Sequence, residues 1–174
     1  PRKHSVEQKW PALWMDKTGQ TKPLITNPAP YGAPRFSPDG KRLALSIRSG
    51  TSGGADLSLF DLERETLSRL TSTGKEDYSV SYPVWAPDGK HIVVRHPAPA
   101  GHSLAWFRAD GVGNAQVLYE SADPLTPYAF SADGKVLLFT ASPPATSNDI
   151  WALPLDLADP EHPKPGKPQV FVQT

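Results

Sequence analysis

Phe36-Ser37-Pro38-Asp39-Gly40-Lys41 is the stretch that decides the fold of this chain, because its pattern returns twice downstream. It recurs as Trp85-Ala86-Pro87-Asp88-Gly89-Lys90 and as Phe130-Ser131-Ala132-Asp133-Gly134-Lys135. The three aspartates of the motif are separated by 49 and 45 residues. A self-similar pattern at such a period indicates a structural unit that is repeated along the chain.

Each copy of the motif has the residues of a tight turn between two strands. In the first copy, Pro38 presets the φ angle that the second position of a type I turn requires. Asp39 can accept hydrogen bonds from neighbouring backbone amides, and Gly40 can adopt the positive φ that completes a hairpin. The predicted structural turn residues are therefore Asp39, Gly40, Asp88, Gly89, Asp133 and Gly134.

Short apolar runs follow each turn in a constant order. Second strands are predicted at residues 43–47, 92–94 and 136–139, third strands at 57–61, 105–110 and 150–156, and fourth strands at 67–71, 115–119 and 169–172. The aromatic residue before each turn belongs to the first strand, and we expect it to pack between neighbouring sheets. Four antiparallel strands per unit, repeated radially, predict an all-β fold of the β-propeller class.

The first residues of the chain fit the outer two strands of a further unit. The predicted units are an N-terminal partial blade at 1–31 and three blades at 32–79, 80–124 and 125–174. Propellers close with about four to eight blades, so about three and a half blades predict an incomplete arc. We expect its open apolar faces to be covered by the remaining blades of a longer protein or by self-association.

Composition excludes several classes of function. The chain has 18 Lys+Arg and 18 Asp+Glu, and a chain without net charge is a poor nucleic-acid binder. The absence of cysteine excludes disulfides, thiolate catalysis and cysteine-ligated zinc. No stretch approaches the roughly 18 apolar residues that span a membrane. We therefore predict neither a nucleic-acid partner nor membrane insertion.

The candidate catalytic motifs are interpreted as structural features. Residues 50–54 match the G-x-S-x-G string of a nucleophile elbow, but the string lies between two antiparallel strands instead of a strand and a helix. His91 and His96 are five residues apart on a strand, so their side chains point to opposite faces, and we interpret them as surface or rim histidines. The Asp-Gly turns lack the alternating oxygen donors of a calcium loop. We predict no catalytic, cofactor-binding or metal-binding residue.

Tyrosines mark the predicted binding surface. The loops between successive blades open onto one end of the ring, and loops on a rigid scaffold frequently carry binding residues. Four of the five tyrosines fall in or beside these loops, and tyrosine provides contact area at low entropic cost. We predict Tyr31, Tyr78 and Tyr82 as partner-binding residues, whereas Tyr128 enters a strand and is expected to pack against the next blade.

The Ser/Ala-Pro-Asp-Gly-Lys repeat with its aromatic lead-in resembles the WD40-like propeller repeats of the TolB type, as does Arg69-Leu70-Thr71 at the end of a blade. The likeness covers residues 12–174. Within that group, residues 14–19 and 149–155 resemble propeller segments found C-terminal to bacterial serine/threonine protein kinases. The resemblance implies a bacterial protein and favours a periplasmic or extracytoplasmic location.

Similar repeats precede the catalytic domain of prolyl-oligopeptidase-type serine peptidases and also form certain lyases, so the fold does not fix the function. The sequence contains no kinase or peptidase catalytic motif. We predict a non-catalytic protein- or ligand-binding propeller module of a larger bacterial protein, with a protein or peptide partner. Two alternatives stay open: the gating propeller of a prolyl-oligopeptidase-type peptidase, and a propeller lyase.

Overall fold

The structure is a computed structural model that describes residues 9–49, 54–72, 79–143 and 149–173. These residues form strands connected by turns and loops, and they contain no helix. The all-β prediction is therefore confirmed. It follows that the described part of the chain offers no helix with the length and apolar character needed to cross a membrane.

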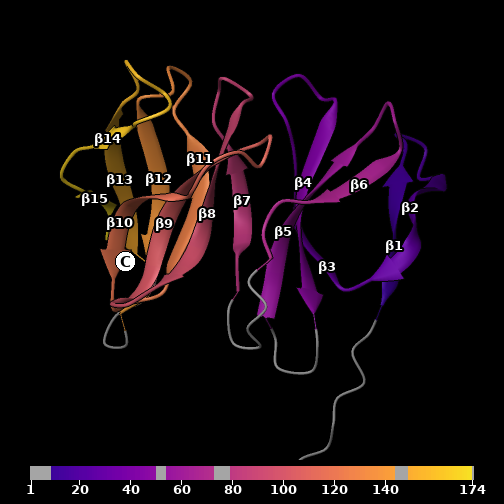
Figure 1. Cartoon of the computed structure of the whole chain (residues 1–174), viewed down its shortest axis with the longest axis horizontal. Helices are drawn as coiled ribbons and strands as arrows, with labels where there is room; N and C mark the ends of the chain where they lie inside the picture. Colours follow the sequence, from indigo (N-terminus) through magenta and orange to yellow (C-terminus); the bar gives the residue numbers. More distant parts are fainter. Residues whose placement is uncertain (1–8, 50–53, 73–78, 144–148, 174) are drawn as a thin grey trace, which may run out of the picture.

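The strands are grouped into four sheets in chain order (Figure 1). The half-blade consists of β1 (Trp10–Met15) and β2 (Thr21–Ala29). Blade 1 consists of β3 (Tyr31–Phe36), β4 (Arg42–Ser49), β5 (Gly54–Asp61) and β6 (Thr66–Arg69). Blade 2 consists of β7 (Ser81–Trp85), β8 (His91–Ala98), β9 (Gly101–Arg108) and β10 (Gln116–Ser121). Blade 3 consists of β11 (Leu125–Phe130), β12 (Val136–Ala141), β13 (Asp149–Asp156), β14 (Lys164–Pro165) and β15 (Gln169–Val172).

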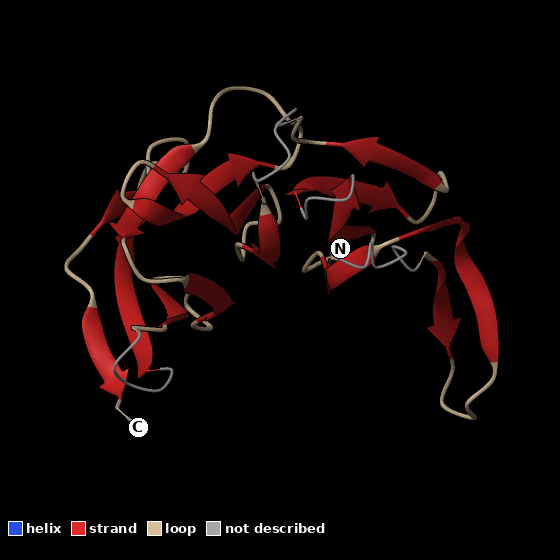
Figure 2. Ribbon diagram, turned by 90° about the horizontal axis from the view of Figure 1, so that it is seen from below, coloured by secondary structure: helices blue, strands red, loops and turns tan. Residues whose placement is uncertain are grey.

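Strands that are neighbours in sequence pair antiparallel in each blade, and in blade 3 both β14 and β15 pair with β13. The first strands β3, β7 and β11 lie next to one another across the blades, so they are the inner strands. The sheets follow an arc from the half-blade at the right of Figure 2 to blade 3 at the left, where the C-terminus lies. The described residues therefore form an incomplete propeller, as predicted.

The turn motifs share one hydrogen-bond pattern. In the first copy, the amide of Gly40 donates to the carbonyl of Ser37 at 2.8 Å, and the amide of Lys41 donates to Oδ1 of Asp39 at 3.0 Å. In the other two copies the matching bonds to aspartate come from Lys90 and Lys135. The motif glycines all have positive φ angles: +70° at Gly40, +64° at Gly89 and +73° at Gly134.

Successive turns also pack against each other. A Cβ atom at Gly134 would lie 3.1 Å from Cγ of Pro87 in the preceding turn, whereas a Cβ atom at Gly40 would have nothing within 4 Å. The third turn therefore has less room for a side chain than the first.

This difference predicts the relative cost of two alanine substitutions. Both Gly40→Ala and Gly134→Ala place a Cβ at positive φ, which costs about 1–2 kcal/mol. Only Gly134→Ala also displaces Pro87, so we expect it to lower the free energy of unfolding by more than Gly40→Ala does. Equilibrium unfolding in urea measures both values, and an equal loss in the two variants would contradict the packing between turns.

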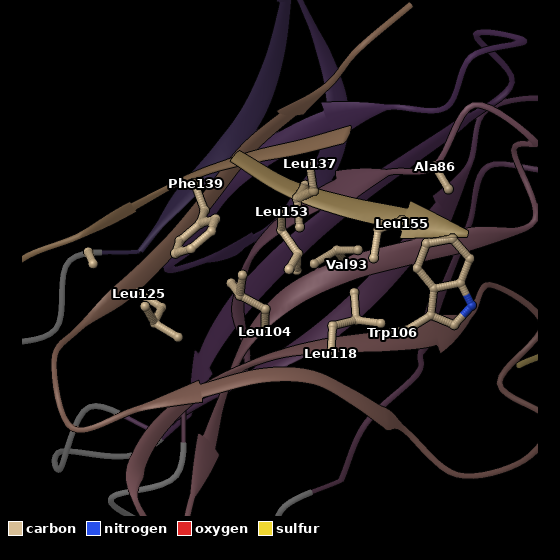
Figure 3. Packing of buried hydrophobic residues seen from close by; sticks show 11 residues of the cluster. Ala86, Val93, Leu104, Trp106, Leu118, Leu125, Leu137, Phe139, Leu153 and Leu155 are labelled. Atoms are coloured by element: carbon tan, nitrogen blue, oxygen red, sulfur yellow. The ribbon is translucent and has the colours of Figure 1, made fainter. Parts of the chain in front are cut away.

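Buried side chains fill the spaces between successive sheets. Figure 3 shows the cluster between blades 2 and 3, to which both blades contribute. Its members include Val93, Leu104, Trp106, Leu118, Leu125, Leu137, Phe139, Leu153 and Leu155. A second cluster between blades 1 and 2 contains Leu57, Leu59, Trp85, Ile92 and Val94. Because each sheet contributes side chains to its neighbour, the blades stabilise one another.

The aromatic residue before each turn contacts the preceding sheet. The ring of Phe36 lies edge-on to Trp14 of the half-blade at 5.7 Å, and Phe130 lies edge-on to Trp106 of blade 2 at 6.3 Å. Trp85 is buried, and its Nε1 donates to the carbonyl of Arg35 in blade 1 at 3.0 Å. The expectation that these aromatics pack between neighbouring sheets is confirmed for Trp85 and Phe130, whereas Phe36 contacts Trp14 but stays 46 % exposed.

Both ends of the arc expose apolar side chains. On the half-blade, Trp10 is 64 % and Met15 is 66 % exposed, and on β15 Phe171 is 65 % exposed. Burial of one large apolar side chain contributes about 1.5–3 kcal/mol. A blade or a second copy packed on either end would therefore be stabilised by contacts with these residues.

Candidate binding surface on the inner strands

Each inner strand carries one extra residue relative to its partner. Along β7 the register advances by three residues from Ser81 to Val84, while β8 advances by two from Arg95 to Val93. The same irregularity occurs in β3 between Gly32 and Arg35 and in β11 between Pro127 and Ala129. Such bulges bend a strand and re-aim its side chains, and they are common near functional sites.

Two of these bulges hold residues with an unfavourable backbone conformation. Ala33 in β3 has a φ of +48°, and Tyr82 in β7 has a φ of +55°. Residues with a Cβ rarely occupy this region, which costs about 1–2 kcal/mol. The side chain of Tyr82 is 42 % exposed. The bulge therefore presents an aromatic side chain to solvent at a cost in backbone strain.

Tyr128 lies at the bulge of the neighbouring inner strand β11. It is the residue inserted between Pro127 and Ala129, and it is 53 % exposed. Our expectation that Tyr128 packs against the next blade stays a prediction, because the described residues contain no blade after blade 3. Since β7 and β11 are neighbours, two adjacent blades each expose a tyrosine at the bulge of the inner strand, although Tyr128 is equivalent to Pro83 and not to Tyr82.

Arg95 adds a positive charge beside Tyr82. Its guanidinium carbon lies 5.3 Å from the centre of the Tyr82 ring, and its Nε atom is buried without a hydrogen-bond partner among the described residues. The pKa of His102 on β9 is lowered, mainly by burial and further by the positive charge of Arg95. The negative charge of Asp123 raises this pKa but does not cancel the other two effects. We refer to Tyr82 and Tyr128 of the inner strands, together with Arg95 of the adjacent strand β8, as the inner-strand surface.

The structure places the other predicted binding tyrosines differently. Tyr31 is partly buried against the apolar cluster of the half-blade and blade 1, and its hydroxyl donates to the carbonyl of Asn27 at 2.6 Å. Tyr78 lies outside the described residues, as do residues 50–53 of the G-x-S-x-G string. Of the three candidates, Tyr82 is the one that the described structure presents as an exposed aromatic side chain.

The two histidines of β8 have separate environments. His91 is 2 % exposed, and its ring stacks on Trp106 at 4.8 Å, so its interpretation as a surface or rim histidine is wrong. His91 is buried because Trp106 of the adjacent strand and Glu161 of blade 3 lie against it. His96 is half-buried, and its Nδ1 bonds the carbonyl of Pro97 at 2.7 Å. Across the described ranges, no three His, Asp or Glu side chains are grouped as metal ligands would be.

Comparison with known protein families found no family whose model matches this chain. Among curated proteins, the chain is 29 % identical over 182 residues to the uncharacterized peptidase YuxL of Bacillus subtilis. That alignment covers 83 % of this chain and 26 % of YuxL. The chain thus spans about a quarter of the length of this relative.

Solved structures resemble the chain along most of its length. TolB from Acinetobacter baumannii superposes with a TM-score of 0.69 at 19 % identity, over 92 % of this chain and 37 % of TolB. A prolyl endopeptidase superposes with a TM-score of 0.62 at 18 % identity, over 97 % of this chain and 27 % of that enzyme. Likeness at such low identity concerns the fold. The repeated turn motif, the four-stranded blades and these superpositions together show that the chain has the WD40-like β-propeller fold of the TolB type.

Proposed function

We propose that this chain is a non-catalytic propeller module that binds a protein or peptide partner through the inner-strand surface. The observation that carries the proposal is Tyr82, a bulky residue at a φ of +55° whose side chain is 42 % exposed. Backbone strain of this kind is typical of functional sites. A glycine would occupy the same bulge without strain. We infer that this position holds a strained tyrosine because its aromatic side chain has a binding role.

The chemistry of the surface suits a short acidic segment of a partner. Tyrosine and arginine are enriched among the residues that dominate binding energies at protein interfaces. The ring of Tyr82 offers an apolar contact, and Arg95 offers a cation beside it. A peptide that carries Asp or Glu next to an aromatic or aliphatic residue complements both groups.

Selection of peptides from a random library on the immobilised protein tests this function. We expect enrichment of peptides that combine a carboxylate with an apolar side chain, and we expect their capture to depend on Tyr82. Failure to enrich any peptide, or enrichment of peptides that bind a Tyr82→Gly variant equally well, would contradict the proposed function.

Tyr82→Gly separates binding from stability. Glycine relieves the strain at positive φ, and this gain offsets the lost contact with Arg95, which contributes about 0.5–1 kcal/mol. The free energy of unfolding should therefore change by less than about 1 kcal/mol. Because a central tyrosine supplies a large share of interface energy, the Kd of a selected peptide should rise at least about tenfold. Calorimetric titration and urea unfolding measure the two quantities.

Ala33→Gly is the matched control. It relaxes the equivalent bulge in blade 1 without removing an aromatic side chain. We expect this variant to keep the peptide affinity of the unmodified protein. Equal loss of affinity in Ala33→Gly would show that bulge conformation, and not the tyrosine ring, determines binding.

A second candidate function is a gating propeller for a serine peptidase. It is favoured by the match to YuxL, which is named as a peptidase, and by the superposition on a prolyl endopeptidase. Under this function the full-length protein would cleave prolyl peptide substrates, and Tyr82→Gly would alter KM more than kcat. Peptide binding without such cleavage would favour the non-catalytic module.

A further inference from the structure

A polar pocket lies between blades 2 and 3, away from the inner-strand surface and next to the Asp-Gly turn of blade 2. Its volume is about 540 Å³, which is within the range of small-ligand sites. The residues that matter for its chemistry are His91, Trp106, Arg108, Asn114, Gln116 and Glu161. Five of these belong to blade 2, and Glu161 comes from blade 3.

The segment from Pro160 to Pro163 crosses from blade 3 and forms one wall of the pocket. The indole Nε1 of Trp106 donates to the carbonyl of Pro160 at 3.0 Å, and Nε2 of Gln116 donates to the carbonyl of Pro163 at 2.9 Å. Nη1 of Arg108 donates to Oε2 of Glu161 at 2.6 Å. These three bonds hold Glu161 in place, and Oε1 of its carboxylate faces His91.

His91 has one bonded and one unbonded ring nitrogen. Nδ1 lies 2.6 Å from Oδ2 of Asp88. Burial raises the pKa of Asp88, but hydrogen bonds from His91 and from the amide of Lys90 outweigh burial and hold it below its ordinary 3.8. Asp88 is therefore an ionised acceptor, and Nδ1 of His91 carries the proton.

Nε2 of His91 is then directed at a second acceptor. It lies 3.6 Å from Oε1 of Glu161 and makes no hydrogen bond within the described part of the chain. When the imidazole is neutral this nitrogen is an acceptor, and two acceptors then face each other at the edge of the pocket. A ligand that donates hydrogen bonds to both atoms would satisfy a nitrogen that is otherwise buried without a partner.

We propose that this pocket binds an organic ammonium group, supplied either by a lysine side chain or by a free amine. An ammonium group has three N–H donors and no acceptor. Two of these donors can bond Nε2 of His91 and Oε1 of Glu161, and the third is left for solvent or another polar group of the lining. The proposal is independent of the function assigned to the inner-strand surface.

Charge around the pocket favours a cation over an anion. Arg108 is paired with both Asp110 and Glu161, so its positive charge is already balanced. In and beside the pocket, the carboxylates of Asp88, Asp110 and Glu161 equal in number the cations of Arg42, Lys90 and Arg108, so the nearest group decides the preference, and the charged group nearest to Nε2 of His91 is the carboxylate of Glu161. A carboxylate or phosphate ligand at His91 would meet the carboxylate of Glu161 at close range, so we expect an anion to bind there less well than a cation.

Titration of the protein with n-butylamine, Nα-acetyl-lysine methylamide and sodium butyrate tests the site, with the imidazole ¹⁵N signals of His91 as the readout. We expect both amines to shift the Nε2 signal of His91 in a saturable manner, while butyrate leaves it in place. Glu161→Gln should weaken binding of n-butylamine at least about tenfold, because a charged partner of the ammonium is lost. Thermal unfolding of Glu161→Gln verifies that the variant is folded.

Glu63→Gln is the control, because Glu63 forms an exposed ion pair with Lys41 in blade 1 and lies outside this pocket. It should bind the amines like the unmodified protein. Tighter binding of the lysine derivative than of n-butylamine would assign the site to a protein side chain, and the reverse order would assign it to a free amine. Binding of butyrate, no effect of the amines on His91, or unchanged amine affinity in Glu161→Gln would overturn the proposal.

Discussion

Phe139→Ala is expected to lower the free energy of unfolding by about 3–5 kcal/mol. Phe139 is fully buried in β12 and belongs to the cluster that joins blade 3 to blade 2. Its ring lies 5.6 Å from Tyr119 and 6.4 Å from Trp151. Removal of the ring leaves a cavity between two sheets, and equilibrium unfolding in guanidinium chloride measures the loss.

Tyr128→Ala serves as the comparison for Phe139→Ala. Tyr128 is an aromatic residue on the neighbouring strand of the same blade, but it is 53 % exposed. Surface substitutions usually change stability by less than about 0.5 kcal/mol. Similar losses in the two variants would contradict the placement of the apolar cluster between blades 2 and 3.

Asp88→Ala is expected to lower the free energy of unfolding by about 2–3 kcal/mol, because several hydrogen bonds to one ionised group are lost together. Oδ1 of Asp88 accepts from the amides of Lys90 and His91 at 2.8 and 3.1 Å, and Oδ2 bonds the buried ring of His91. The variant leaves Nδ1 of His91 buried without its acceptor. Unfolding in urea at pH 7 measures the effect.

The equivalent aspartate of the first turn provides the control for Asp88→Ala. Asp39 accepts hydrogen bonds from the amide of Lys41 and the hydroxyl of Ser37. The residue three positions after this aspartate is Arg42 in the first turn, whereas it is His91 in the second. Since no buried ring depends on Asp39, Asp39→Ala should destabilise the protein less. Equal losses would contradict the special role of the Asp88–His91 pair.

The pH dependence of stability gives a second measure of Asp88. Its pKa in the folded protein is lower than the ordinary 3.8, so its contribution to stability is fully present above pH 3.8. That contribution is lost as the pH falls below 3.8 toward the folded pKa. The difference in unfolding free energy between the unmodified protein and Asp88→Ala should therefore shrink in strong acid.

The repeated turn motif was sufficient to predict the blades. Asp39, Asp88 and Asp133 are spaced at a blade period, and the apolar runs after each turn fall within β4, β8 and β12. These features are local, because turn geometry depends on a few adjacent residues and strands alternate with a period of two. The short strand β14 (Lys164–Pro165) was not predicted, since two residues carry no periodic pattern.

The candidate sites were harder to predict because they depend on contacts between distant segments. Burial of His91 requires Glu161, which lies 70 residues downstream in blade 3. The exposure of Tyr128 depends on one inserted residue in β11 that apolar alternation does not indicate. Tyr82 was predicted from its place between blades, but its positive φ and its contact with Arg95 are properties of the folded chain.

The location of a bound partner tests the proposed function most directly. A crystal structure of the protein with a peptide selected from the library is predicted to show the peptide across β7 and β11, with its carboxylate at Arg95 and its apolar side chain on the ring of Tyr82. A peptide bound instead to the exposed apolar ends at β1 or β15, with Tyr82 in contact only with solvent, would contradict the assignment of the inner-strand surface.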